Sequence, residues 1–110
     1  MRKSLIVLPL FAASLFAGVQ TWKDAPVVDA MCATQAKANP DKHTRECSIG
    51  CARSGLGILT PDGTFLKFDK TGAERAVAAL KAAQKADHIR ATVTGERQGD
   101  TIKVSSLTLN

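Results

Sequence analysis

The sequence is poor in aromatic side chains and contains no tyrosine. Aromatic residues make up 5% of its 110 positions, and beyond residue 20 they are only Trp22, Phe65 and Phe68. Proteins that bind single-stranded nucleic acid stack bases on several aromatic rings inside a basic groove. The formal net charge of +5 is mild, and Arg2 and Lys3 supply two of these charges. We therefore expect no nucleic-acid partner.

The signatures of several enzyme classes are missing as well. No serine lies in a G-x-S-x-G nucleophile elbow, and the ten acidic residues form no obvious pair for acid–base chemistry. The C-x-x-C motif of thioredoxin-like redox centres and the C-x-x-C-H motif of c-type haem attachment are both absent. The sequence therefore predicts a non-enzymatic protein, and thiol redox chemistry is the alternative.

Residues 1–20 read as a secretory signal peptide. They combine a basic start, an apolar run and small residues before the predicted cleavage site. The apolar run is too short and too poorly flanked for a stable membrane span, although an uncleaved N-terminal anchor is the alternative. We expect cleavage between Gly18 and Trp22. The product would be a single domain at residues 21–110, a monomer without membrane attachment in the periplasm or outside the cell.

Apolar patterning predicts a chain made mainly of strands. The expected strands are residues 27–31, the two arms of a hairpin around Pro61, Asp62 and Gly63, the alternating segment 88–94, and residues 101–109. In the last segment the apolar parity shifts between Val104 and Leu107. A shift of this kind predicts a bulge at Ser105 and Ser106.

Two helices are expected between these strands. Thr71 and Glu74 have the spacing of a capping box, in which each side chain satisfies the free amide of the other residue. The apolar positions that follow share one helical face: Ala73, Ala76, Val77, Leu80 and Ala83. The second helix lies in an insert at residues 32–55. Asn39 and Pro40 favour its start and Gly55 its end.

The predicted fold class is mainly β with one or two helices. The order strand, insert helix, two strands, helix, two strands is that of a small five-stranded OB-like barrel with an insertion. The segments "VVDAMC" and "VTGERQGDTIKVSSLTL" resemble small exported bacterial OB-fold-like proteins, here with a Cys/His insert. That resemblance implies a fold and an export route, and it implies no activity. Oligonucleotide or oligosaccharide binding is the weaker alternative that the barrel itself suggests.

The chemistry of the insert is concentrated in three cysteines and one histidine: Cys32, His43, Cys47 and Cys51. On a continuous helix, residues four apart lie one above another, so His43, Cys47 and Cys51 would form one stripe. Cys32 at the end of the first strand could approach that stripe. Three thiolates and one imidazole are a known tetrahedral zinc set and also suit copper(I). The sequence therefore predicts a zinc or copper site.

Two other interpretations of the cysteines remain open. Exported proteins meet an oxidising compartment, and three cysteines allow one disulfide with one thiol left over. A bridge between Cys47 and Cys51 would close a very small loop, whereas Cys32 with either of them would tie the insert to the barrel. A working redox pair is the third interpretation.

The local C-x-x-x-C motif with a nearby histidine also resembles the copper-handling motif of the Sco-type assembly proteins. Those proteins have a larger thioredoxin-like fold, which this chain is too short to build. The resemblance therefore covers Cys47, Cys51 and His43 alone, and it implies copper handling as an alternative function. The second histidine, His88, stands next to Asp87 and is expected to be a solvated residue at a strand edge.

Overall fold

The computed structural model describes residues 18–110. Residues 1–17 of the predicted signal peptide lie outside this range. The first strand, β1 (Val19–Asp29), already includes Val19 and Gln20, which pair with the edge of β4. Within residues 18–110, no helix is both long enough and apolar enough to cross a membrane.

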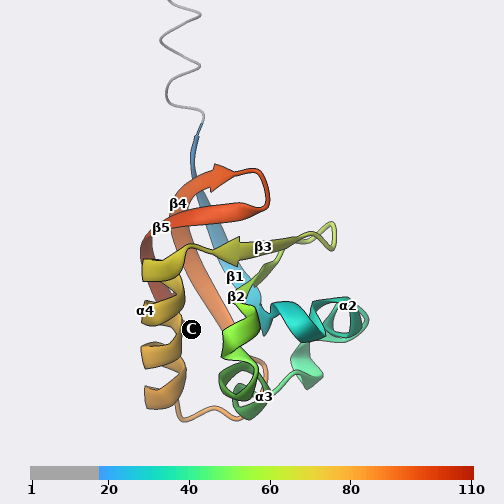
Figure 1. The fold of residues 1–110 in the computed structure, drawn as a ribbon. Helices are drawn as coiled ribbons and strands as arrows, with labels where there is room; N and C mark the ends of the chain where they lie inside the picture. The colour runs from blue at the N-terminus through green and yellow to red at the C-terminus, as the bar shows by residue number, and fades with distance from the viewer. Residues whose placement is uncertain (1–17) are drawn as a thin grey trace, which may run out of the picture.

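Five strands form a closed barrel in the order β1-β2-β3-β5-β4 (Figure 1). The strands after β1 are β2 (Leu56–Leu59), β3 (Phe65–Phe68), β4 (Arg90–Gln98) and β5 (Thr101–Leu109). All neighbouring strands are antiparallel except β3 and β5, which run parallel and close the barrel. The helix α4 (Lys70–Ala82) connects β3 to β4. This arrangement confirms the predicted five-stranded OB-like barrel.

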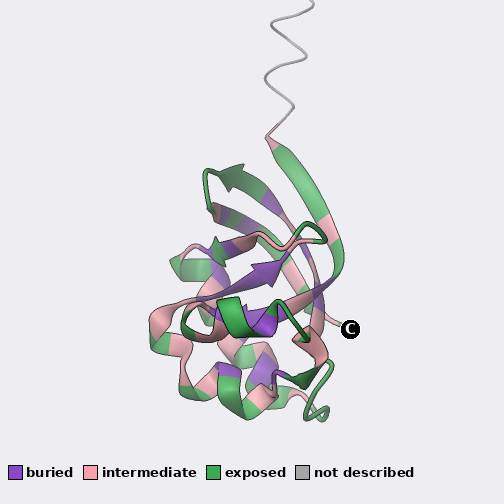
Figure 2. Ribbon diagram, turned by 90° about the vertical axis from the view of Figure 1, so that its right-hand side faces the viewer, coloured by how far each residue is buried: buried purple, intermediate pink, exposed green. Residues whose placement is uncertain are grey.

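The barrel interior is filled by apolar side chains from every strand and from α4. Buried residues run along the strands in Figure 2, while the start of β1 and the tip of the β4–β5 hairpin are exposed. Fully or almost fully buried members include Val27, Leu56, Ile58, Leu66, Leu80, Val93 and Ile102. A second, smaller cluster contains Val28, Ala33, Ala36 and Leu59, and it packs the start of the insert against β1 and β2.

The predicted bulge in the last strand is confirmed. Thr94 of β4 pairs with Ser106, but the next residue, Gly95, pairs with Val104, so Ser105 has no partner. The extra residue bends the strand. The apolar side chains therefore stand at even-numbered positions before the bulge and at odd-numbered positions after it. A Cβ atom at position 95 would collide with the carbonyl oxygen of Lys103, so only glycine fits there.

β1 is longer and less regular than the predicted strand at residues 27–31. Its first half pairs with β4 and its last three residues pair with β2, and the register against β4 shifts between Trp22 and Ala25. Asp24 at this shift has a left-handed φ of 52°. The polar composition around it hides the strand from pattern analysis, because the alternation is interrupted.

The cap of α4 differs from the prediction. Asp69, and not Thr71, is the N-cap residue, and its side chain accepts a hydrogen bond from the Gly72 amide at 3.0 Å. The same oxygen, Oδ1, accepts from the Val104 amide at 3.2 Å. The Asp69 carboxylate accepts hydrogen bonds from both the helix and β5, so it is a better N-cap than Thr71 two residues later. The predicted apolar face is confirmed, with Ala76 and Leu80 completely buried.

We expect Asp69→Ala to lower the free energy of unfolding by about 1–2 kcal/mol, because loss of an N-cap costs about that much. Thr71→Ala should change it by less than about 0.5 kcal/mol, as exposed substitutions usually do. Urea denaturation of the two variants beside the parent protein measures both values. A larger loss for Thr71→Ala than for Asp69→Ala would contradict the observed cap.

The insert is not the single helix that was predicted. It is divided into short pieces: η2 (Ala30–Cys32), α2 (Ala33–Ala36), η3 (Pro40–Lys42), α3 (Arg45–Gly50) and η4 (Ala52–Ser54). His43 and Thr44 are extended, and the Thr44 hydroxyl caps α3 by accepting from the Cys47 amide at 3.1 Å. A new helix start at Thr44 therefore separates His43 from the two later cysteines.

Candidate metal site

Asp29 is the centre of a group of polar side chains where β1 meets the insert. Ala25, Val27 and Asp29 alternate along β1, and this parity places the carboxylate on the barrel side, where it is 0% exposed. Its Oδ2 atom accepts a hydrogen bond from the Cys32 amide at 3.0 Å and so caps η2. The other oxygen, Oδ1, takes no part in this cap.

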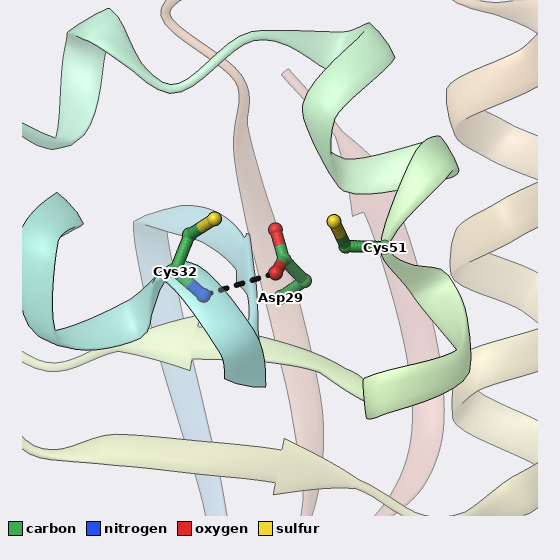
Figure 3. Close-up of side chains that lie close together, drawn as sticks. All are labelled: Asp29, Cys32 and Cys51. Atoms are coloured by element: carbon green, nitrogen blue, oxygen red, sulfur yellow. Dashed lines mark hydrogen bonds between the residues drawn. The ribbon is translucent and has the colours of Figure 1, made fainter.

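Cys32 and Cys51 approach that carboxylate from opposite directions. Cys32 ends η2, and Cys51 is the C-cap residue of α3. Both sulfur atoms point toward the Asp29 carboxylate, which lies between them (Figure 3). The ligand atoms of Asp29, Cys32 and Cys51 all lie within 4.8 Å of one another. Three side chains from three elements therefore converge on one point.

Hydrogen bonds of the backbone and of the Ser54 hydroxyl hold the two cysteine-bearing segments together. The Met31 amide donates to the Ser54 hydroxyl at 3.1 Å, and the Ala30 amide donates to the Gly55 carbonyl at 2.8 Å. The Ser54 hydroxyl in turn donates to the Cys51 carbonyl at 2.8 Å. The separation of the two thiols is thus fixed by structure around them and does not depend on a bond between them.

His43 reaches the same group through the carboxylate. Its Nε2 atom lies 2.8 Å from Asp29 Oδ1, and its side chain is 7% exposed. This distance is that of an ion pair, although neither atom makes a regular hydrogen bond. Across residues 18–110, the buried side-chain polar atoms without a hydrogen-bond partner are Asp29 Oδ1, His43 Nε2 and Ser48 Oγ. Such atoms call for an explanation, and a bound ion is one of the few available.

The predicted stripe of His43, Cys47 and Cys51 does not exist. Cys47 is exposed on α3 and belongs to no cluster of metal-binding atoms found between residues 18 and 110. The structure brings Cys32 and Cys51 to one place and adds Asp29, which sequence reasoning did not select. His43 contacts that carboxylate but is not among the three mutually close ligand residues. Strand parity was the available signal, since it puts an acidic residue on the core face three positions before a cysteine.

All three cysteines are free thiols in the structure. The disulfide from Cys32, one of the interpretations left open by the sequence, is therefore not formed in the structure. The Cys51 sulfur is within 4.8 Å of the Cys32 sulfur, which makes Cys51 an available partner for either a bridge or a shared ion.

The environment raises the pKa of the Cys32 thiol. Desolvation is the largest cause, and the Asp29 charge and a hydrogen bond with Asp29 follow; Cys51 and Cys47 add smaller repulsions. Each of these disfavours the thiolate, so an ion that binds here must displace a proton from Cys32.

We expect iodoacetamide at neutral pH to modify Cys47 first and Cys32 last. Cys47 is exposed, whereas Cys32 is partly buried and has a raised pKa, and alkylation needs an accessible thiolate. Peptide mapping by mass spectrometry over a time course gives the order. Faster labelling of Cys32 than of Cys47 would contradict the placement of both residues.

The other histidine lies outside this group. His88 is 61% exposed, with Nδ1 at 2.9 Å from Asp87 and Nε2 at 3.8 Å from Asp41. The predicted solvated position of His88 is confirmed. Its left-handed φ of 53° marks the turn that leads into β4.

Comparisons of this chain with models of protein families, with curated proteins and with solved structures give no match. The fold class, a five-stranded closed OB-like barrel, therefore rests on the strand order and pairing described above. The resemblance to exported OB-fold-like proteins stays a prediction.

Proposed function

We propose that this protein is an exported, non-enzymatic OB-like module that binds one zinc ion through Asp29, Cys32, His43 and Cys51. The observation that carries the proposal is the convergence of Asp29, Cys32 and Cys51 on one point, with His43 in contact with the buried Asp29 carboxylate at 2.8 Å. Export rests on the signal-like sequence of residues 1–20.

The donor set and its spacing suit a tetrahedral ion. Zinc binds thiolate sulfur at about 2.3 Å and imidazole nitrogen or carboxylate oxygen at about 2.0 Å, so neighbouring ligand atoms stand about 3.3–3.8 Å apart. The observed atoms fall within 4.8 Å of one another for three ligands, and within 2.8 Å for the carboxylate–imidazole pair. Binding would draw the three mutually close atoms together and turn the His43 ring from the carboxylate toward the ion.

Zinc fits this set better than copper(I). Copper(I) prefers soft sulfur ligands, whereas zinc accepts sulfur, imidazole and carboxylate together. The three negative charges of two thiolates and one carboxylate, with the +2 charge of the ion, give the site a net charge of −1. The neutral imidazole is the fourth ligand. The exposed Cys47 would have to move to provide the sulfur-rich site that copper(I) favours.

The position of the ligands supports a structural role for the ion. Asp29 ends a barrel strand, Cys32 ends the first turn of the insert, His43 precedes α3, and Cys51 ends α3. An ion held by all four would join both ends and the middle of the insert to the barrel. Four protein ligands leave no open position for a substrate, which is the arrangement of structural zinc sites. In a domain of this size, one such cross-link contributes much of the stability.

Titration of the reduced protein with cobalt(II) tests the proposal. Thiolate coordination gives an intense charge-transfer band in the near ultraviolet. We expect this band to saturate at one equivalent, to be lost in Cys32→Ser and Cys51→Ser, and to remain in Cys47→Ser. The Cys47→Ser variant is the matched control, because it removes a thiol from the same insert.

His43→Ala should keep the sulfur band but weaken binding, since only the nitrogen ligand is removed. Absence of a band in the parent protein would overturn the proposal. Loss of the band in Cys47→Ser would replace the buried site by one centred on α3.

A further inference from the structure

A second hollow lies on a different part of the barrel from the candidate metal site. It has a volume of about 510 Å³ and is bounded by the irregular part of β1, the β2–β3 turn and the insert around α2. In Figure 1 that turn and α2 project from the same side of the barrel. Its wall includes Trp22, Lys23, Asp24, Lys37, Pro61 and Arg90, and none of the four proposed zinc ligands. We call it the β1 groove.

The backbone of β1 gives the β1 groove its shape. The register shift between Trp22 and Ala25, with the left-handed Asp24 inside it, lets consecutive residues of β1 line the same hollow. Strained backbone of this kind persists only where surrounding structure holds it, and it is concentrated at functional sites. Arg90 supplies that support by donating to the Asp24 carbonyl at 3.2 Å and to the Asp41 carboxylate at 2.9 Å.

The charge of the β1 groove is unbalanced. Lys23, Lys37 and Arg90 face a single carboxylate in its wall, that of Asp24. The Asp24 carboxylate accepts a hydrogen bond from the Asn110 side chain at 3.0 Å, and Arg90 is paired with Asp41. Within residues 18–110, neither Lys23 nor Lys37 takes part in an ion pair. The groove therefore has two cations available for an external anion.

The remaining wall is mainly apolar, and it contains the only tryptophan of the chain. Trp22 is partly buried, packs against the barrel core and still lines the groove, together with Pro26, Pro40 and Leu59. A hollow of a few hundred Å³ with apolar walls and a few polar groups is the usual form of a small-molecule site. The flat indole and the proline rings suit a planar ring system.

We propose that the β1 groove binds a small organic anion. Its planar apolar body would lie against Trp22, and its carboxylate, sulfonate or phosphate would be held by Lys23 and Lys37. This activity is separate from zinc binding, because the two sites share no ligand residue. Failure of one proposal therefore leaves the other standing.

The dye 1-anilinonaphthalene-8-sulfonate is a suitable probe, since it joins aromatic rings to a single sulfonate. We expect it to quench Trp22 fluorescence by energy transfer with one site per protein. N-phenyl-1-naphthylamine has the same rings without the sulfonate and should bind at least several-fold more weakly. The double variant Lys23→Gln/Lys37→Gln should bind the sulfonate dye roughly tenfold more weakly, as loss of two exposed charge contacts implies.

The matched control is Lys70→Gln/Lys81→Gln, which removes two exposed charges on α4, away from the groove. It should bind the sulfonate dye like the parent. All four lysines are exposed, and matching unfolding midpoints verify that both variants fold. Equal dye affinity of the two double variants would overturn the proposal. Binding of the dye without quenching of Trp22 would also overturn it, because the occupied surface would then lie elsewhere.

Discussion

Zinc is expected to raise the free energy of unfolding of the reduced protein by about 2.7 kcal/mol when the free ion is a hundredfold above its dissociation constant. The gain follows because the proposed ligands are brought together only in the folded chain. Urea denaturation in buffered zinc, and again with a chelator, measures it. Protein oxidised at Cys32 and Cys51 should show no gain, since metal capture needs both thiolates.

Asp29→Asn should abolish most of this zinc-dependent gain. The substitution keeps the size of the side chain and an oxygen that can accept from the Cys32 amide, but it removes the charged ligand at the centre of the site. Loss of an outer partner of a metal ligand costs about 10–100-fold in affinity, and loss of a ligand itself should cost more. Asp100→Asn at the exposed β4–β5 turn is the matched control and should keep the full gain.

The zinc-dependent stability of these two variants can also contradict the proposed role of Asp29. If Asp29→Asn and Asp100→Asn gain equal stability from zinc, the carboxylate is no ligand. Asp29 would then serve only as the cap of η2 and the buried neighbour of His43.

Leu80→Ala is expected to lower the free energy of unfolding by about 2–5 kcal/mol, the range for large-to-small substitutions in a packed core. Leu80 is 0% exposed and belongs to the cluster that α4 shares with the barrel strands. With about 90 residues in the domain, a loss of this size is a large part of the total stability. Thermal and urea unfolding of the variant give the value.

Lys81→Ala, one residue further along α4, is the matched control for Leu80→Ala. Lys81 is exposed, so its replacement should change stability by less than about 0.5 kcal/mol. A loss that small for Leu80→Ala would mean that the apolar face of α4 does not seal the barrel.

Much of the fold could be predicted because its signals are local. The turn at residues 61–63, the strict alternation in β4 and the apolar face of α4 each depend on neighbours in sequence. The bulge at Ser105 was also visible, as a change of parity. The start of β1 was not, because its polar residues form a strand only by pairing with the distant β4. The Asp69 cap depends likewise on Val104, 35 residues away.

The candidate site was predictable only in part. Cysteine and histidine stand out by their chemistry. Of the four selected residues, Cys32 and Cys51 do lie together, and His43 contacts the carboxylate between them. Their arrangement could not be read from the spacing, because Thr44 starts a new helix and leaves His43 extended. Asp29 looked like an ordinary polar residue at a strand end. Its role depends on burial, and burial is decided by the closure of β1 on β2 and by the folding of the insert over both.

X-ray absorption at the zinc edge of the zinc-loaded, reduced protein tests the central claim most directly. The account predicts four ligands, two of them sulfur at about 2.3 Å and two of them nitrogen or oxygen at about 2.0 Å, one with the scattering pattern of imidazole. The same spectrum should be obtained from Cys47→Ser. A shell with three sulfur atoms, or a spectrum of hexahydrated zinc with no sulfur, would contradict the account.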